Sequence, residues 1–178
     1  PNVYTIKYEK NKDTATGEMP STKHTYDVEQ QLAENAFSAD GYTFEGWATK
    51  QDIKAQYGDG ETVLNLTEKA DAEITLYAVW NVQSYTISYS GVDMAGVTNT
   101  NKTSYTVEDG KIDLMDPVRT GYTFKGWYEN ESLEGKAVKT IEQGTTGDKV
   151  FYAKWEANKD TPYRWHIMLK NWKNRRKI

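Results

Sequence analysis

The chain contains two copies of one sequence pattern, and this duplication limits its possible folds more than any other feature. The string GYTFEGW at residues 41–47 returns as GYTFKGW at 121–127, and TLYAVW at 75–80 returns as VFYAKW at 150–155. A string that recurs in the same order is the signature of a repeated structural unit. The pattern therefore predicts one small unit that folds twice, not one large domain.

The duplication divides the 178 residues into three predicted parts. We expect one repeat at residues 1–81, a second repeat at 82–157, and a separate basic tail at 158–178. The segment NVQS joins Trp80 to Tyr85. Because a short linker holds neighbouring domains close and limits their relative orientations, this spacing predicts an elongated, semi-rigid rod of modules.

Composition indicates what has to stabilise such small repeats. A domain of about 80 residues buries only roughly 60–65% of its unfolded surface, and small domains often add disulfides or metals. The chain has no cysteine, which excludes a disulfide scaffold, a cysteine zinc site and a thiol nucleophile. Aromatic residues make up 13% of the chain, and a few of them in each repeat would supply most of the core.

The repeated strings alternate with the period of strands, and comparing the copies shows which side faces inward. Val79 in the first copy corresponds to Lys154 in the second, and a position that accepts lysine is a poor core position. The apolar and aromatic residues that alternate with such variable positions are therefore predicted to be core, and the tryptophans of GYTFxGW are added to them for the reason given below. These residues are Tyr4, Ile6, Tyr42, Phe44, Trp47, Leu76, Ala78 and Trp80 in the first repeat, and Tyr85, Ile87, Tyr122, Phe124, Trp127, Phe151, Ala153 and Trp155 in the second.

Trp47 and Trp127 can only lie inside if this alternation is interrupted. Strict alternation would place Trp47 on the same face as Glu45, which is expected to face water. A glycine within a strand often marks a β-bulge that redirects the next side chain. We therefore expect bulges at Gly46 and Gly126 that turn both tryptophans inward or along the sheet edge.

Strands dominate the pattern, but three segments leave room for other structure. Residues 29–37 are compatible with a helical turn, and segments 48–73 and 128–148 differ most between the copies. Each of the two divergent segments has room for a short helix or an extra strand. We therefore expect an α+β fold, mostly β, for each repeat.

The combination Y-T-I-x-Y, G-Y-T-F-x-G-W and Y-A-x-W, present in both copies, resembles the Listeria–Bacteroides repeat, also called the internalin B B-repeat. The resemblance covers residues 4–80 and 85–155. It implies a compact β-grasp-like fold, related in shape to ubiquitin-type domains. It also implies tandem arrays in large secreted or wall-attached bacterial proteins, as stalks or spacers, some with a part in host or surface contact. The family has no catalytic residues to transfer, so its motif residues are expected to be structural.

The sequence contains no pattern typical of an active site, a cofactor site or a metal site. His24 and His166 do not recur in the other copy and lack the partners of a zinc motif, so both are expected at the surface. Residues 52–61 lack the ligand pattern of a calcium loop, and GTTGDK at 144–149 lacks the ending of a phosphate-binding loop. The chain is therefore predicted not to be an enzyme and to need no cofactor or metal.

Charge is distributed unevenly along the chain. Residues 164–178 carry six lysines and arginines and no acidic residue, which leaves 16 basic and 26 acidic residues in the rest. Because an acidic body repels nucleic acid, nucleic acid is not an expected partner of the repeats. The sequence has no apolar run of about 18 residues, so no transmembrane segment is predicted.

The tail departs from the repeat pattern after Tyr163. Trp165, Met168, Leu169 and Trp172 follow helical spacing among basic residues. This pattern is compatible with a helix that binds a membrane surface or a partner. Two other interpretations stay open: a terminal cap, and a third repeat that is truncated or shifted in reading frame.

Two functions are compatible with these observations. The first is a non-enzymatic stalk or spacer of a secreted or cell-wall-attached bacterial protein, monomeric in itself, that presents a distal domain. The second is an adhesin-type module whose divergent segments, 48–73 and 128–148, contact a host protein or a glycan. The motif tryptophans could also stack on sugars, although their alternation with other apolar residues favours the core.

Overall fold

The computed structural model describes residues 2–159, which form strands, turns and loops. Contacts divide the chain into two compact units. Their described residues are 2–86, Thr103–Ile112 and Ile141–Asp148 in the first unit, and Ile87–Lys102, Asp113–Thr140 and 149–159 in the second. No helix of the described residues is long and apolar enough to cross a membrane. The basic tail from residue 160 on lies outside the described residues, as do all the interpretations of it.

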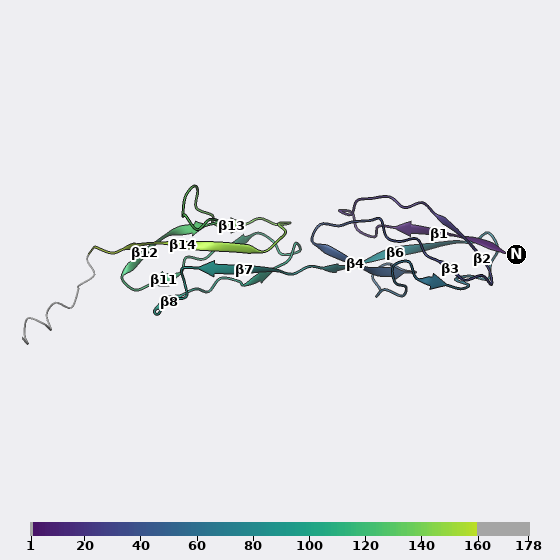
Figure 1. Cartoon of the computed structure of the whole chain (residues 1–178), viewed down its shortest axis with the longest axis horizontal. Coiled ribbons are helices and arrows are strands. Elements are labelled where there is room, and N and C mark those ends of the chain that lie inside the picture. The colour runs from purple at the N-terminus through teal and green to yellow at the C-terminus, as the bar shows by residue number, and fades with distance from the viewer. Residues whose placement is uncertain (1, 160–178) are drawn as a thin grey trace, which may run out of the picture. The chain divides into compact units, whose positions relative to one another are not determined.

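The first repeat is built on a four-stranded mixed sheet with the order β2-β1-β6-β4 (Figure 1). Its strands are β1 (Val3–Glu9), β2 (Thr22–Thr25), β4 (Tyr42–Ala48) and β6 (Glu73–Val82). β1 and β6 come from the two ends of the repeat and run parallel in the centre, with Ile6 opposite Ile74. β2 and β4 pair antiparallel at the two edges. The long crossover that a parallel pair requires is supplied by residues 10–72.

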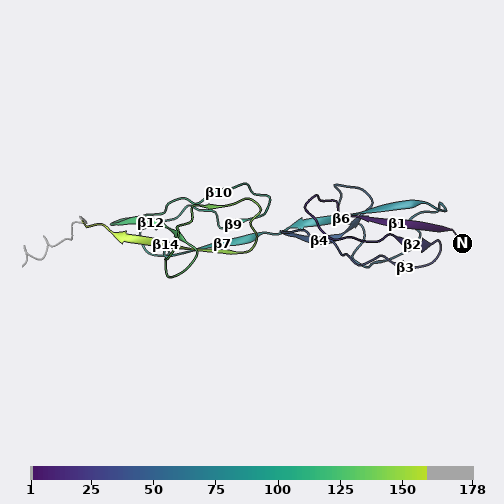
Figure 2. The same ribbon diagram turned by 90° about the horizontal axis from the view of Figure 1, so that it is seen from above.

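The second repeat contains a sheet with the same order and the same strand directions (Figures 1 and 2). Its strands are β7 (Tyr85–Ser90), β9 (Ser104–Tyr105), β12 (Tyr122–Tyr128) and β14 (Lys149–Ala157). β7 and β14 run parallel, and β9 and β12 pair antiparallel with them at the edges. The sheet topology is therefore duplicated together with the sequence pattern.

Residues 2–159 also contain three pairs of very short strands outside the two four-stranded sheets. They are β3 (Gln30–Gln31) with β5 (Thr62–Val63), β8 (Val97–Thr98) with β11 (Val118–Arg119), and β10 (Ile112–Asp113) with β13 (Thr140–Ile141). β3, β5 and β13 fall in the segments for which the sequence left room for helices, whereas β8, β10 and β11 lie outside those segments. Each pair joins two segments of the long connection between the first and last strands of its repeat.

The fold is all-β in residues 2–159, so the predicted α+β class and the helical turn at 29–37 are wrong. The backbone around β3 forms its hydrogen bonds with β5 and not with its own preceding turn. Leu32 N donates to the backbone oxygen of Glu61 at 2.9 Å, next to the β3–β5 ladder. Pairing with a distant strand has replaced the local hydrogen bonds on which a helix depends.

The core of the first repeat lies on one face of its sheet. Tyr4, Ile6 and Tyr8 of β1 are buried, and the residues between them are more exposed, as the period of a strand requires. Leu76 and Ala78 of β6 are fully buried on the same side. The cluster is completed by Leu32, Phe37, Trp47 and Val63.

Both GYTFxGW strands contain an irregularity just before the tryptophan. The register of β4 against β6 shifts before Gly46, and the register of β12 against β14 shifts before Gly126. Gly46 has a φ of 145° and Gly126 a φ of 132°, in the region that favours glycine. The extra residue redirects the next side chain, and Trp47 and Trp127 are both buried.

The predicted core residues fall into three groups by exposure. Buried are Tyr4, Ile6, Trp47, Leu76, Ala78, Ile87, Trp127, Phe151 and Ala153. Partly buried are Tyr42, Phe44, Trp80, Tyr85, Phe124 and Trp155. Tyr122 is 37% exposed, so its assignment to the core is wrong. Tyr122 is the first residue of β12, where the sheet ends, and its ring packs on the guanidinium of Arg119 at 3.5 Å from the ring centre.

Candidate functional site

The residues that recur in both copies meet in one aromatic cluster in each repeat. In the first repeat the ring of Trp47 lies 4.9 Å from the rings of both Tyr8 and Phe44. Phe44 in turn lies 5.7 Å from Trp80. The rings are tilted or edge-on, which is the arrangement that aromatic quadrupoles favour. Because β1, β4 and β6 each contribute at least one ring, the cluster holds three neighbouring strands together.

The second repeat forms the same cluster from the equivalent residues. The ring of Trp127 lies 5.0 Å from Tyr89 and 5.2 Å from Phe124. Phe124 lies 5.4 Å from Trp155. The motif residues of both copies therefore share one packing arrangement, contributed by β7, β12 and β14.

The outer tryptophan of each cluster is also fixed by a hydrogen bond. Trp80 Nε1 donates to the backbone oxygen of Lys10, and Trp155 Nε1 donates to that of Gly91, each at 2.8 Å. Both acceptors lie in the loop after the first strand of their repeat. These bonds orient the rings against the protein itself.

Trp47 and Trp127 are 0% and 1% exposed, so neither ring presents a face to solvent. Sugar stacking requires an accessible ring face, and the sugar-stacking alternative is therefore wrong for these two residues. The bulge glycines beside them have no room for a side chain. A Cβ on Gly46 would lie 2.4 Å from the backbone oxygen of Tyr57, and a Cβ on Gly126 would lie 2.7 Å from the Cβ of Ala137.

A groove of about 1180 Å³ on the first repeat is a better candidate for a ligand site. Its lining joins the loop Lys10–Ala15 to Tyr8, Phe37, Tyr42, Thr75 and Tyr77. The loop is held in place, because Asn11 Nδ2 donates to the backbone oxygen of Ala78 at 3.0 Å. Lys12 Nζ lies 3.8 Å from the ring centre of Tyr42. Tyrosines and charges of both signs line this groove, so it suits a polar ligand better than an apolar one.

A cavity of about 460 Å³ on the second repeat lies at a different place in the module. Its lining includes Asp113, Leu114, Lys125, Trp127 and Lys139. It adjoins β10 and β12, whereas the groove of the first repeat adjoins the loop after β1. The repeats therefore share a core arrangement, while these two hollows lie at different places in the module.

Two acidic residues of segment 52–61 accept backbone hydrogen bonds. Asp59 Oδ1 accepts a hydrogen bond from the backbone N of Asn35 at 2.7 Å, and the Glu61 carboxylate accepts one from the backbone N of Gly58. Within residues 2–159, no group of three or more His, Cys, Asp or Glu side chains is placed to hold a metal ion. The carboxylates of Asp59 and Glu61 therefore serve the loop itself.

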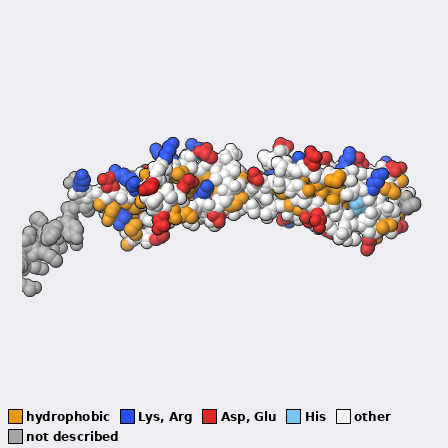
Figure 3. Space-filling model, turned by 45° about the horizontal axis from the view of Figure 1, so that its top comes forward, with side chains coloured by type: hydrophobic (Ala, Val, Ile, Leu, Met, Phe, Trp, Pro, Cys, Tyr) orange, Lys and Arg blue, Asp and Glu red, His pale blue; other side chains and the backbone are white. Residues whose placement is uncertain are grey.

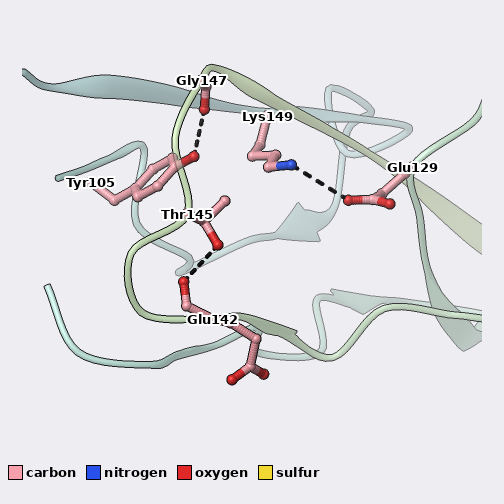
Figure 4. Close-up of polar contacts among 6 residues, drawn as sticks. All are labelled: Tyr105, Glu129, Glu142, Thr145, Gly147 and Lys149. Atoms are coloured by element: carbon pink, nitrogen blue, oxygen red, sulfur yellow. Dashed lines mark hydrogen bonds and ion pairs between the residues drawn. The ribbon is translucent and has the colours of Figure 1, made fainter. Parts of the chain in front are cut away.

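The GTTGDK turn before β14 is closed by hydrogen bonds of its own (Figure 4). The Thr145 hydroxyl donates to the backbone oxygen of Glu142 at 2.6 Å. Asp148 Oδ1 accepts from the backbone N of Thr86 at 2.7 Å, and this hydrogen bond lowers the pKa of the Asp148 carboxyl. The turn thus presents a carboxylate, which a phosphate group would avoid.

His24 lies inside the first repeat, so its predicted surface position is wrong. It is 2% exposed, and its ring lies 5.7 Å from the ring of Tyr4. The reason is its register, because His24 is paired with Tyr4 in the β1–β2 ladder and shares its face of the sheet. His166 lies outside the described residues.

The outer faces of the sheets carry exposed ion pairs. Lys7 Nζ lies 2.8 Å from Glu73 Oε1, and Lys125 Nζ lies 2.6 Å from Glu156 Oε2. Figure 3 shows acidic and basic side chains interspersed over the face that it displays. A face of mixed sign gives little attraction for a polyanion.

Comparison with known proteins identifies the repeat. The sequence profile of the Listeria–Bacteroides repeat domain matches residues 4–79 and 85–154. The chain is 29% identical to a protein of Evansella cellulosilytica that is described as a Gly-rich membrane protein, over 90% of this chain and 18% of that protein. It is 34% identical to Internalin H of Listeria monocytogenes, over 69% of this chain and 20% of that protein.

A solved structure of streptococcal SHIRT domains 3-4 from a cell surface protein covers 89% of this chain and 99% of that one, with 12% identity and a TM-score of 0.24. That score is too low to indicate a shared fold. The chain spans about a fifth of the length of the curated relatives that it matches, at 18% and 20%. Two profile matches cover most of the chain, each with its own aromatic cluster, and the chain belongs to the Listeria–Bacteroides repeat family.

Proposed function

We propose that the chain is a non-enzymatic spacer within a bacterial protein outside the cell, secreted or wall-attached, and that it holds a distal domain away from the surface. One observation carries this proposal: the recurring rings form the same packing cluster twice. The bulge glycines Gly46 and Gly126 have no room for a side chain in either copy. Residues that are buried to hold strands together are unavailable to a ligand. What the two copies share is therefore a structural core, as in other proteins built from repeats.

The linker between the repeats supports a semi-rigid spacer. β6 ends at Val82 and β7 begins at Tyr85. Gln83 N donates to the backbone oxygen of Gly41 at 2.8 Å, and the Tyr85 hydroxyl donates to Gln83 Oε1 at 3.1 Å. A linker that is short and internally bonded restricts the orientations of its neighbours. We therefore propose that the two repeats, each a separate domain, form an elongated monomeric rod.

The order of the strands supports the β-grasp relation that the sequence resemblance implies. In both sheets the first and last strands of the repeat run parallel in the centre, and antiparallel strands occupy the edges. We propose a β-grasp-like sheet in which the connection after the second strand is irregular and not helical.

Small-angle X-ray scattering of the full chain tests the spacer. A compact globule of 178 residues would have a radius of gyration of about 16 Å, and an elongated monomer should clearly exceed that value. A matched variant with Gly-Ser residues inserted between Gln83 and Ser84 should broaden the distance distribution, because it releases the short linker. A radius near 16 Å would contradict the spacer proposal.

The groove of the first repeat favours a second candidate function, a module that binds a host protein or a glycan. Tyr42 and Tyr77 in a groove with charged loop residues resemble the lining of a polar ligand site. This location differs from the divergent segments that the sequence indicated. Of the lining residues, Gln51 falls within residues 48–73.

A glycan array and a pull-down from host-cell surface extract, both with the full chain, test this candidate. Tyr77 has a natural counterpart in Tyr152, at the same position of the last strand in the second repeat. Binding that is lost in Tyr77→Ala and kept in Tyr152→Ala would assign the ligand to the groove. If no ligand binds reproducibly, the spacer proposal stands alone.

A further inference from the structure

A histidine, His24, lies inside the first repeat at a position where the second repeat has a tyrosine. Of these two residue types, only histidine ordinarily titrates near neutral pH. His24 lies in β2, opposite Tyr4 of β1, and it is 2% exposed. By the same register, Tyr105 of β9 lies opposite Tyr85 of β7. The ring-to-ring distances are similar, 5.7 Å for the first pair and 5.6 Å for the second. His24 and Tyr105 therefore occupy equivalent positions in the two repeats.

The two side chains differ in how their polar atoms are satisfied. The hydroxyl of Tyr105 donates to the backbone oxygen of Gly147 (Figure 4). His24 Nδ1 is buried and has no hydrogen-bond partner among residues 2–159. A protonated imidazole donates from both ring nitrogens, so the cation would bury an N–H without an acceptor. The neutral ring avoids most of this cost.

The ring contact described for His24 is with an uncharged side chain, and desolvation by burial is the cause that shifts its pKa. Facing it on β1 is the phenol of Tyr4, whose oxygen accepts a hydrogen bond from the backbone N of Leu66 at 3.4 Å. Two charged residues are exposed at the surface: Lys23, which precedes His24 on β2, and Asp71, which lies shortly before β6. Burial lowers the pKa of His24. The folded repeat therefore disfavours the imidazolium.

β2 is the strand that a charge on His24 would destabilise first. It is an edge strand of four residues that pairs with β1 alone. The loop that connects β1 to β2 also supplies Lys10–Ala15, Glu18 and Met19 to the groove. An event that frees β2 from β1 therefore removes the anchor at one end of this loop, while Asn11 and the pairing of Thr16 with Ser38 still hold its other part.

We propose that the first repeat carries an acid-sensitive latch, in which protonation of His24 releases β2 and the adjoining end of the groove loop while the second repeat stays closed. The latch consists of His24, Tyr4 and the β1–β2 ladder. It needs no ligand, so it holds whether the chain is a spacer or a binding module.

The direction of the pH dependence follows from the lowered pKa. Above pH about 6.5 the imidazole is neutral in both the closed and the open forms, and pH has no effect through this group. Below that value the open form binds a proton that the closed form does not. The equilibrium constant for opening then rises by up to about tenfold per pH unit, until the lowered pKa of the closed form is reached.

Hydrogen exchange measured by mass spectrometry on the full chain, from pH 7.5 to 5.5, tests the latch. Protection factors, corrected for intrinsic exchange, should fall by up to about tenfold per pH unit below about 6.5 in residues 3–25. They should stay constant in residues 85–105. His24→Tyr copies the second repeat, and this variant should lose the pH dependence.

Equal acid dependence in the natural chain and in His24→Tyr would overturn the latch, and so would equal loss of protection in both repeats. If His24→Tyr does not fold, His24→Gln, which keeps a polar side chain without a titrating group, replaces it in the same experiment. NMR titration of the imidazole gives an independent reading. A pKa at or above about 6.5 for His24 in the folded chain would also overturn the proposal.

Discussion

The two repeats agree in their cores and differ at the positions around them. Trp47 and Trp127 each contact one tyrosine of the first strand and one phenylalanine of their own strand, at closely similar distances. By contrast, Tyr42 contacts Lys12 while its counterpart Tyr122 contacts Arg119. Close packing permits few arrangements of buried rings, whereas solvent-facing positions accept many side chains. The difference indicates that any function specific to one repeat lies outside the shared cluster.

Removing one central tryptophan should give the largest loss of stability, and this loss should be confined to the repeat that contains it. Trp47→Ala deletes a fully buried ring, which costs about 3–5 kcal/mol and is enough to unfold a marginal small domain. Trp127→Ala should do the same to the second repeat. Urea unfolding of the full chain, followed by hydrogen exchange, assigns the loss to one repeat. Equal destabilisation of both repeats by either variant would show that the cores unfold as one unit.

A methyl group at the bulge should have the next largest effect and should distinguish the copies. In Gly46→Ala the new Cβ meets the backbone oxygen of Tyr57, which has little freedom to move, and the residue keeps a positive φ. We expect a loss of roughly 2–4 kcal/mol from strain and overpacking together. Gly126→Ala meets the side chain of Ala137 and should cost less.

Gly96 provides the control for these variants. It has a φ of 81°, but an added methyl group there would have no other atom within 4 Å, so Gly96→Ala tests backbone strain alone. We expect it to cost roughly 1 kcal/mol. Thermal unfolding of the three variants gives the ranking. If Gly96→Ala costs as much as Gly46→Ala, steric enclosure at the bulge is not what requires glycine.

Comparing the copies allowed the direction of many side chains to be read from sequence. The substitution of Val79 by Lys154 reveals the outer face of the last strand, and alternation then places Leu76 and Ala78 inside, where they are fully buried. Tyr122 shows the limit of this reasoning. Alternation reports which face a residue lies on, but it does not report where the sheet ends, and Tyr122 lies at that end.

Two features could not be read from sequence, for different physical reasons. Strands of two residues such as β3 have no measurable period, and their partners come from distant segments, so tertiary contacts override the local preference of residues 29–37. His24 is misplaced by its residue type, because histidine is often exposed. The sequence did carry one signal, because His24 follows Tyr4 at the same spacing at which Tyr105 follows Tyr85, and this spacing aligns His24 with Tyr105.

The second repeat should be sensitive to alkali. Burial raises the pKa of Tyr89 to about 12, from the ordinary tyrosine value of 10. Between these values the unfolded chain releases a proton that the folded repeat retains, so stability falls as pH rises, by at most about tenfold in the unfolding equilibrium per pH unit. Tyr89→Phe should reduce this slope and leave the part that comes from Tyr105, whose pKa is also raised by burial. The variant keeps the ring contacts with Trp127 and Phe151, although it loses the hydrogen bond to the backbone oxygen of Lys102. Urea unfolding of the full chain from pH 9 to 11.5 measures the slope. If Tyr89→Phe keeps the full slope of the natural chain, Tyr89 is not the source of that slope. The proposed contrast would then lose its alkali-sensitive second repeat, and the acid sensitivity of the first repeat would be tested separately.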